Sequence, residues 1–336
     1  MNRFSIGNSF SITVFGESHG EMIGVVMDGV PVGIPLSPDD FTADLERRRS
    51  GAKGTTPRSE SDEPHIVSGL YNGHTTGAPL TVVFYNDNTR SADYEALRTT
   101  PRPSHADRVA AVKFGGYNDP RGGGHFSGRL TLTLVAAGVV AKKIIGSSVE
   151  FSTRITEIGS EKDSAKFADT IAAALADGDS VGGRVECTVS GVPTGIGEPF
   201  FDSVESVASH LLFSIPAVKG VEFGAGFEVC RRRGSENNDL IINPDGKTAT
   251  NNDGGINGGI SNGNPIKVSV AFKPTASISR EQQSINLESG EVGPMQIQGR
   301  HDVHQLLKLM HMYWITTALK LLSNLHILRY RLLLRR

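Results

Sequence analysis

The stretch GVPVGI at Gly29–Ile34 has a close copy, GVPTGI at Gly191–Ile196, in the second half of the chain, and this repeat is the first indication of how the chain folds. Each copy follows a strand-like apolar segment and precedes a pattern typical of an amphipathic helix. We therefore predict two related halves, roughly 1–150 and 151–303, that pack as a single domain over 1–303. The alternative is a coincidence between glycine–proline turns, which are common in loops.

A second pair of matching segments follows in the same order. Gly77–Leu80 (GAPL) leads to Phe84, and Gly263–Ile266 (GNPI) leads to Phe272. Apolar alternation predicts strands, and 3.6-residue periodicity predicts helices. The strands are expected at 10–15, 23–28, 65–70, 80–85, 184–190 and 266–272, and the helices at 38–49, 104–113, 128–145, 163–177 and 201–213. Single helices do not regularly separate these strands, so an α+β fold is favoured over a doubly wound parallel sheet.

Composition excludes several classes of protein. Of 336 residues, 38% are hydrophobic and 21% charged, which is typical of a globular chain. The net charge of −2 argues against a general nucleic-acid binder. Cys187 and Cys230 form no metal-like or disulfide framework, and two thiols suit the reducing cytosol. The sequence shows no signal-peptide pattern and no run of 18 apolar residues, so a cytoplasmic protein without a membrane span is expected.

Two segments present imidazoles among polar residues. Gly16–Gly20 (GESHG) follows a predicted strand and presents Ser18 and His19, either for chemistry or as a tight turn whose side chains cap neighbouring groups. Arg102–Asp107 (RPSHAD) places His105 near a helix start, where it could titrate near neutral pH or be structural.

Two further segments favour anion binding. Arg47–Arg58 carries five cations with hydroxyl side chains among them, although a solvated helix end is the alternative. Arg121–Arg129 (RGGGHFSGR) offers free backbone N–H groups at a predicted helix start, although a flexible glycine loop is the alternative. Neither segment matches a P-loop or a Rossmann fingerprint. Together with the imidazoles, they predict an enzyme or binding protein for a multiply anionic small molecule.

The end of the second half adds more polar groups. Lys273–Ile278 follows a predicted strand with a cation and two hydroxyls, and Gly299–Asp302 (GRHD) adds a cation, an imidazole and a carboxylate. With His304 the latter could form half of a metal site, but it lacks the ligand number that a metal centre needs, so no metal is predicted.

These motifs, in this order, resemble the chorismate synthase family, in its bacterial form without large insertions. Gly16–Gly20, Arg121–Arg129 and Gly299–Asp302 carry the resemblance. Arg47–Gly51, Arg102–Asp107 and Lys273–Ile278 agree with it, and the match is collinear over about nine tenths of the chain.

The resemblance implies a β-α-β sandwich with internal pseudo-symmetry, assembled as a homotetramer. It implies a carbon–oxygen lyase of the shikimate pathway of aromatic amino acid biosynthesis. The implied reaction is anti-1,4-elimination of phosphate from 5-enolpyruvylshikimate 3-phosphate, giving chorismate. Reduced FMN would be required but not consumed, with NADPH as an indirect reductant.

The resemblance also implies roles for individual residues. His19 would protonate the departing phosphate, His105 would lie beside the flavin N1, and Asp302 would assist at N5. Ser18 and Ser127 would relay or position protons, and Arg48, Lys53 and Arg129 would bind substrate or pyridine nucleotide. The implied flavin contacts are His125, Phe126, Ser127, Pro216, Ala217, Gly258, Lys273, Pro274, Thr275, Ala276, Ser277 and Arg300.

The C-terminal tail departs from the family pattern, which continues with an alanine- and valine-rich helix. Residues 304–336 contain no Asp or Glu and carry six Lys or Arg residues. Two alternatives therefore stay open. One is an inactive or unstable relative that still binds FMN or partners, and the other is a protein whose basic tail binds a membrane surface.

Overall fold

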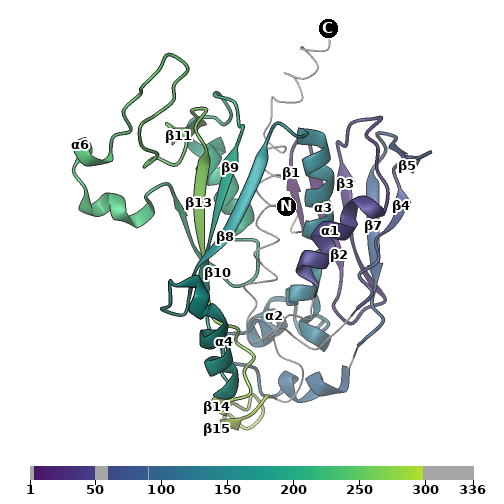
Figure 1. The fold of residues 1–336 in the computed structure, drawn as a ribbon. Helices are drawn as coiled ribbons and strands as arrows, with labels where there is room; N and C mark the ends of the chain where they lie inside the picture. Colours follow the sequence, from purple (N-terminus) through teal and green to yellow (C-terminus); the bar gives the residue numbers. More distant parts are fainter. Residues whose placement is uncertain (1–3, 50–59, 90, 298–336) are drawn as a thin grey trace.

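Two antiparallel sheets, one from each half of the chain, form the frame of the molecule (Figure 1). The computed structural model describes residues 4–49, 60–89 and 91–297. The first sheet has the strand order β1 (Ser5–Gly7), β2 (Ser11–Gly16), β3 (Met22–Asp28), β7 (Leu80–Tyr85), β4 (His65–Ser68). The second has the order β10 (Val218–Phe223), β13 (Ile266–Phe272), β9 (Gly183–Ser190), β8 (Glu150–Ile158).

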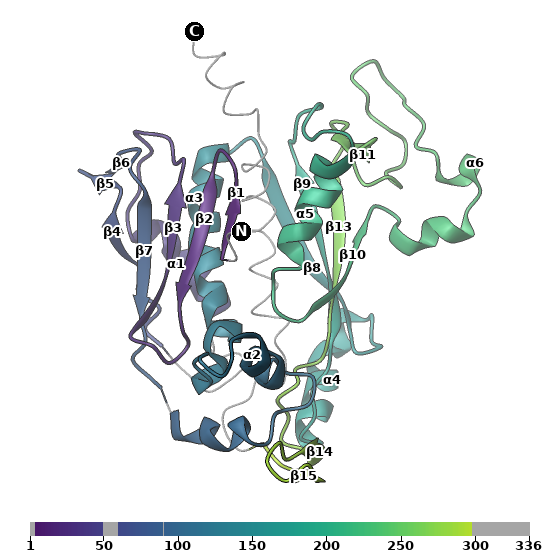
Figure 2. The same ribbon diagram turned by 180° about the vertical axis from the view of Figure 1, so that it is seen from behind.

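Helices cover one face of each sheet. In Figures 1 and 2, α1 (Asp39–Arg48) and α3 (Thr131–Ile145) lie against the first sheet, and α5 (Val204–Leu212) lies against the second. The other α-helices of the described chain are α2 (Asp107–Lys113), α4 (Phe167–Ala176) and α6 (Gly234–Asn237). Short 3₁₀ segments are η1 (Ser91–Arg98), η2 (Arg121–Phe126), η3 (Gly128–Leu130), η4 (Ser164–Lys166), η5 (Phe200–Asp202) and η6 (Gly226–Arg231).

Three small hairpins complete the described chain. They pair β5 (Leu70–Tyr71) with β6 (His74–Thr75), β11 (Ile256–Asn257) with β12 (Ile260–Ser261), and β14 (Gln282–Ile285) with β15 (Val292–Met295). With these, the α+β architecture expected from the sequence is confirmed.

The sequence repeat corresponds to a repeated turn. In the first half, the Thr75 hydroxyl donates to Pro31 O (2.6 Å) and accepts from Ile34 N (2.9 Å). In the second half, the Ser261 hydroxyl donates to Pro193 O (2.6 Å) and accepts from Ile196 N (2.9 Å). The same hydroxyl bridge therefore closes both turns, and the division of the chain into two related halves stays a prediction.

Glycine begins each of these turns for a steric reason. Gly29 has φ +74°, and a Cβ there would lie 1.8 Å from Ser9 O. Gly191 has φ +79°, and its Cβ would lie 1.9 Å from Ser148 O. Each glycine therefore lets a strand end pass close to the neighbouring backbone.

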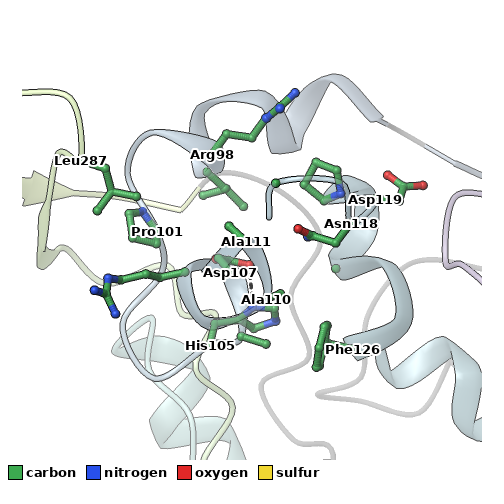
Figure 3. A pocket seen from close by; sticks show the side chains of 16 residues that line it. Arg98, Pro101, His105, Asp107, Ala110, Ala111, Asn118, Asp119, Phe126 and Leu287 are labelled. Carbon is green, nitrogen blue, oxygen red and sulfur yellow. Dashed lines mark hydrogen bonds and ion pairs between the residues drawn. The ribbon is translucent and has the colours of Figure 1, made fainter. Parts of the chain in front are cut away.

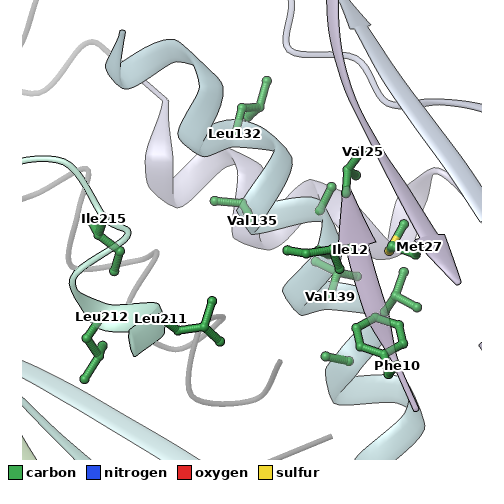
Figure 4. Close-up of a cluster of buried hydrophobic side chains, with 14 of the residues drawn as sticks. Phe10, Ile12, Val25, Met27, Leu132, Val135, Val139, Leu211, Leu212 and Ile215 are labelled. Atoms are coloured by element: carbon green, nitrogen blue, oxygen red, sulfur yellow. The ribbon is translucent and has the colours of Figure 1, made fainter. Parts of the chain in front are cut away.

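Helix α3 lies at the centre of the core. Most of its residues are apolar and buried, apart from Lys142 and Lys143 in the last turn, and Leu132, Val135 and Ala136 have no exposed surface. Figure 4 shows Leu132, Val135 and Val139 of α3 together with Ile12 of β2 and residues near the end of α5. One contiguous cluster joins both sheets, and each fully buried aliphatic side chain contributes about 1.5–3 kcal/mol.

In the two large sheets, β1, β8 and β10 were not expected from the sequence, and the helix predicted at 104–113 starts later than expected. In β8 the polar residues Ser152, Thr153 and Arg154 follow one another, and β10 is interrupted by Lys219 and Gly220. The helix predicted at 104–113 begins at Asp107, because Ser104 has φ +57° and cannot lie in a right-handed helix.

The hydroxyl bridges allow a paired stability test. Thr75→Val and Ser261→Ala should each lower the free energy of unfolding by roughly 1–3 kcal/mol, because each leaves a buried N–H without its acceptor. The two losses should add in the double variant, since the sites lie in different halves. Urea unfolding measures the free energy of unfolding of the two single variants and the double variant. Ser68→Ala, which changes an exposed residue on β4, is the control. Losses below about 0.5 kcal/mol at both sites would mean that the bridges do not stabilise the turns.

Candidate active site

A cavity of about 610 Å³ lies where the two halves meet. The first half lines it with parts of 102–106 and 122–128, and the second with 213–219 and 273–277. Ten of the predicted flavin contacts line this cavity: His125, Phe126, Ser127, Pro216, Ala217, Lys273, Pro274, Thr275, Ala276 and Ser277. Its size is within the usual range for small-molecule pockets.

Charge in this cavity has one sign. Arg102, Lys219 and Lys273 line it, and no carboxylate side chain does among the described residues. Burial lowers the pKa of Lys273 below its ordinary value of 10.5, and the charge of Lys219 lowers it further. Such a lining suits an anionic ligand.

A three-glycine loop separates two imidazoles at the edge of the cavity. A Cβ on Gly122 would lie 2.4 Å from His19 Cδ2, and one on Gly123 would lie 3.6 Å from His105 Cε1. Gly122, Gly123 and Gly124 all have positive φ, at 60°, 81° and 53°. The sequence-predicted residues His19 and His105 therefore lie on either side of one loop.

The turn after β2 holds Ser18 and His19 in the interior. Ser18 is fully buried, and its N–H donates to Gly124 O at 3.3 Å. The His19 ring meets Tyr94 edge to face, with centroids 5.2 Å apart. Asn86 closes the turn, because its amide donates to the carbonyls of Glu17 (3.1 Å) and Gly20 (2.8 Å).

His105 is oriented by a carboxylate. Its Nδ1 donates to Asp107 Oδ1 at 2.7 Å, which directs the other ring nitrogen away from Asp107. Arg102 contacts both oxygens of that carboxylate, at 2.8 and 2.7 Å. Burial disfavours the charge of Asp107, but these hydrogen bonds outweigh burial and hold its pKa well below the usual range.

Arg102 also joins the two halves of the molecule. Its NH1 donates to Ser277 Oγ at 3.0 Å, across the cavity lining from the first half to the second. The same guanidinium lies 5.9 Å from the centre of the Tyr94 ring. Arg102, Asp107, Tyr94 and Asn86 were not among the site residues predicted from the sequence. Arg102 and Asp107 do flank His105 in its motif, and that signal could have identified them.

A smaller cavity of about 190 Å³ lies on another side of His105 (Figure 3). Asn118, Asp119, Phe126 and Leu287 line it with His105 and Asp107. Arg121 donates twice to Asp119, and these bonds lower the pKa of that carboxyl despite partial burial. His105 and Phe126 therefore line both cavities.

Arg48 and Arg129 lie outside the large cavity, on one buried carboxylate. Arg129 NH1 contacts Asp62 Oδ1, and Arg48 NH1 lies 3.6 Å from Asp62 Oδ2. Arg129 Nε also donates to Asn86 Oδ1 at 3.0 Å. Arg48 NH2 donates to Gly128 O at 3.0 Å. Both arginines support the glycine loop and the turn that holds His19.

Some of the remaining predicted residues are placed by the structure, and others lie outside the described chain. His125 Nε2 lies 3.0 Å from Glu17 Oε1, and the Ser127 hydroxyl accepts from Arg129 N at the start of η3. Gly258 lies between β11 and β12, away from the large cavity. Lys53, Arg300 and Asp302, and the tail 304–336, lie outside the described residues.

The described residues contain neither a metal-binding cluster nor a membrane-spanning helix. There, no group of three or more His, Cys, Asp and Glu side chains could hold a metal ion. No described helix is both long enough and apolar enough to cross a bilayer.

The Asp107 carboxylate gives a pH-dependent stability test. Asp107→Asn should lower the free energy of unfolding at pH 7 by on the order of 3 kcal/mol, because it leaves Arg102 without its ionic partner. The pKa of Asp107 is lower in the folded protein than in the unfolded chain, so its ionised form stabilises the fold at pH values above the unfolded pKa near 3.8. It is lost as the pH falls through the lower folded pKa, so the difference between variant and parent should shrink in acid.

Chemical unfolding between pH 3 and pH 7 measures this difference, with the exposed α4 variant Asp169→Asn as the control. A difference between Asp107→Asn and the parent that does not change with pH would show that ionisation of Asp107 contributes nothing to folding.

Comparisons with known proteins agree with one another. A family model described as chorismate synthase matches residues 10–325. A chorismate synthase of Chitinophaga pinensis is 58% identical over 299 residues, covering 89% of each chain. One of Thermococcus gammatolerans is 44% identical over 320 aligned residues, covering 88% of this chain and 90% of that one.

A solved structure supports the same fold. It is described as a crystal structure of chorismate synthase, and it matches with a TM-score of 0.70 and 23% identity. The match covers 96% of this chain and 92% of that one. With the family model and the relatives, the fold and the order of the motifs lead to one conclusion: the chain belongs to the chorismate synthase family.

Proposed function

We propose that this chain eliminates phosphate in the anti-1,4 sense from 5-enolpyruvylshikimate 3-phosphate to give chorismate, with reduced FMN bound. Family membership supports a lyase of the shikimate pathway. The observation that carries the finer proposal is the cavity between the halves. Among the described residues its lining has cations but no carboxylate, and the glycine loop at its edge lies against two imidazoles. The substrate carries two carboxylates and a phosphate, so a lining of this charge matches it.

The cavity also fits the proposed flavin. Phe126, Pro216 and Pro274 offer flat apolar surface for a ring system, while Thr275 and Ser277 offer hydroxyls for its polar edge. When bound, reduced flavin supplies the electron-rich centre that the elimination needs. Predicted contacts at Gly258 and Arg300, and assistance from Asp302, remain part of this proposal.

His19 is the proposed proton donor to the leaving phosphate. Phosphate leaves readily only when its negative charge is neutralised, and an imidazolium can supply both a proton and a charge. Burial of Ser18 and His19 behind Gly122 keeps that proton away from bulk water. Ser18 and Ser127 are proposed to position protons along this edge.

His105 is the proposed partner of the flavin's anionic edge. Asp107 accepts from Nδ1, so the ring is held in one orientation. Arg102 keeps Asp107 ionised, which maintains that hydrogen bond at neutral pH. The three residues thus form one positioning unit.

Anion binding by Arg48, Lys53 and Arg129 belongs to the same proposal. Arg48 and Arg129 both contact the carboxylate of Asp62, and their guanidinium groups are proposed to attract an anionic group of the substrate to this cluster. Homotetramer assembly, NADPH as the indirect reductant and a cytoplasmic location are proposed from the family resemblance.

An anaerobic assay tests the proposal. Purified protein, reduced FMN and 5-enolpyruvylshikimate 3-phosphate should release inorganic phosphate and form chorismate, and omission of reduced FMN should stop both. Flavin binding without phosphate release would instead support the inactive relative. Binding to anionic vesicles that is lost at high salt would support the membrane-surface alternative.

The two imidazoles give a sharper test. His19→Ala and His105→Ala should each slow turnover by about 10²-fold or more while FMN affinity stays largely intact. The exposed β6 variant His74→Ala is the matched control and should behave as the parent. Steady-state kinetics and flavin titration measure the two properties separately. Turnover within about threefold of the parent in both active-site variants would reject their acid–base roles.

A further inference from the structure

Lys219 occupies an irregular position in the second sheet. Between β10 and β13, Val218 lies opposite Phe272 and Gly220 lies opposite Ala271, so Lys219 is an extra residue with no partner. Such a β-bulge turns the extra side chain out of the regular alternation, and bulges are frequent beside active sites. Here the bulge lies on the wall of the large cavity, which Lys219 lines.

The backbone before the bulge is also unusual. Ala217 has φ +72°, a conformation that non-glycine residues rarely adopt. Its carbonyl accepts from Lys273 N at 2.9 Å, which ties the bulge to the first residue after β13. The chain therefore retains local strain at a place where two lysines come together on the cavity wall.

These two lysines differ from the other cations of the sheet. Lys267 on β13 lies 3.5 Å from a Glu186 carboxylate oxygen, and Arg184 on β9 pairs with Glu222. Lys219 and Lys273 have no carboxylate partner in the described part of the chain, and Lys273 Nζ donates to the Ser104 carbonyl at 2.8 Å. The charge of Lys219 is close enough to disfavour that of Lys273, so both would be stabilised by a shared anion.

We propose that the bulge aims Lys219 into the cavity so that Lys219 and Lys273 together bind a phosphomonoester dianion. The inference rests on the proposed function and adds Lys219 to its binding residues. The hydroxyls of Thr275 and Ser277 line the same cavity and can donate to further phosphate oxygens. The dianion is either the 5′-phosphate of the flavin or the phosphate of the substrate, which share this chemistry.

Lys219→Gln separates these two sources. Affinities for FMN and for riboflavin, which lacks the phosphate, are measured by flavin fluorescence, and KM for 5-enolpyruvylshikimate 3-phosphate by steady-state kinetics. Lys247→Gln, an exposed lysine outside the cavity, is the control with the same loss of charge. Thermal melting of each variant verifies that it is folded.

If the flavin phosphate is bound, Lys219→Gln should weaken FMN binding by roughly tenfold, leave riboflavin binding within about twofold, and be rescued by Lys219→Arg. If the substrate phosphate is bound, FMN affinity should hold and KM should rise by a similar factor. Equal weakening of both flavins, or no change in either affinity or in KM, overturns the proposal.

A parent chain that binds no FMN would refute the proposed function rather than this site. Inorganic phosphate then serves as the probe in calorimetry. Weaker phosphate binding by Lys219→Gln than by Lys247→Gln would support the subsite, and equal binding would reject it.

Discussion

The site depends on the close approach of one loop to two imidazoles. Gly122 and Gly123 lie so near His19 and His105 that a side chain on Gly122 would overlap the His19 ring. All three loop glycines also have positive φ, which other residues adopt only with strain. The loop, the turn after β2 and the start of α2 must therefore be placed together, and the buried contacts of Asn86, Asp62 and Arg102 do this.

Buried charge around the loop is arranged so that, among the described residues, no carboxylate lines the cavity. Asp62 and Asp107 each accept from arginine, and both lie behind the residues that line it. An unpaired buried guanidinium would be destabilising, so the pairing with these carboxylates stabilises the buried arginines. The result is a cavity whose field favours anions even though the whole chain carries a net charge of −2.

Much of the frame was predictable because local patterns decide it. The predicted strands and helices agree with the structure to within a few residues, and the repeated turns at Gly29 and Gly191 have the same hydrogen bonds. β8 and β10 were missed because pairing with neighbours, rather than apolar content, makes them strands. Arg129 looked like a free cation in its motif, but its partner Asp62 is 67 positions away, and no local pattern shows that contact.

The two halves contribute equivalent strands but different chemistry. β7 and β13 follow the second pair of repeated segments, and the chain after each of them runs to the same cavity. After β7 come Arg102, His105 and the glycine loop, whereas the described chain after β13 brings Lys273–Ser277 to the cavity. The hydrogen bond from Arg102 to Ser277 joins these two unlike continuations. Neither half alone contains both the imidazoles and the lysine pair. The described part of the site therefore forms where two non-equivalent continuations of the sheets meet.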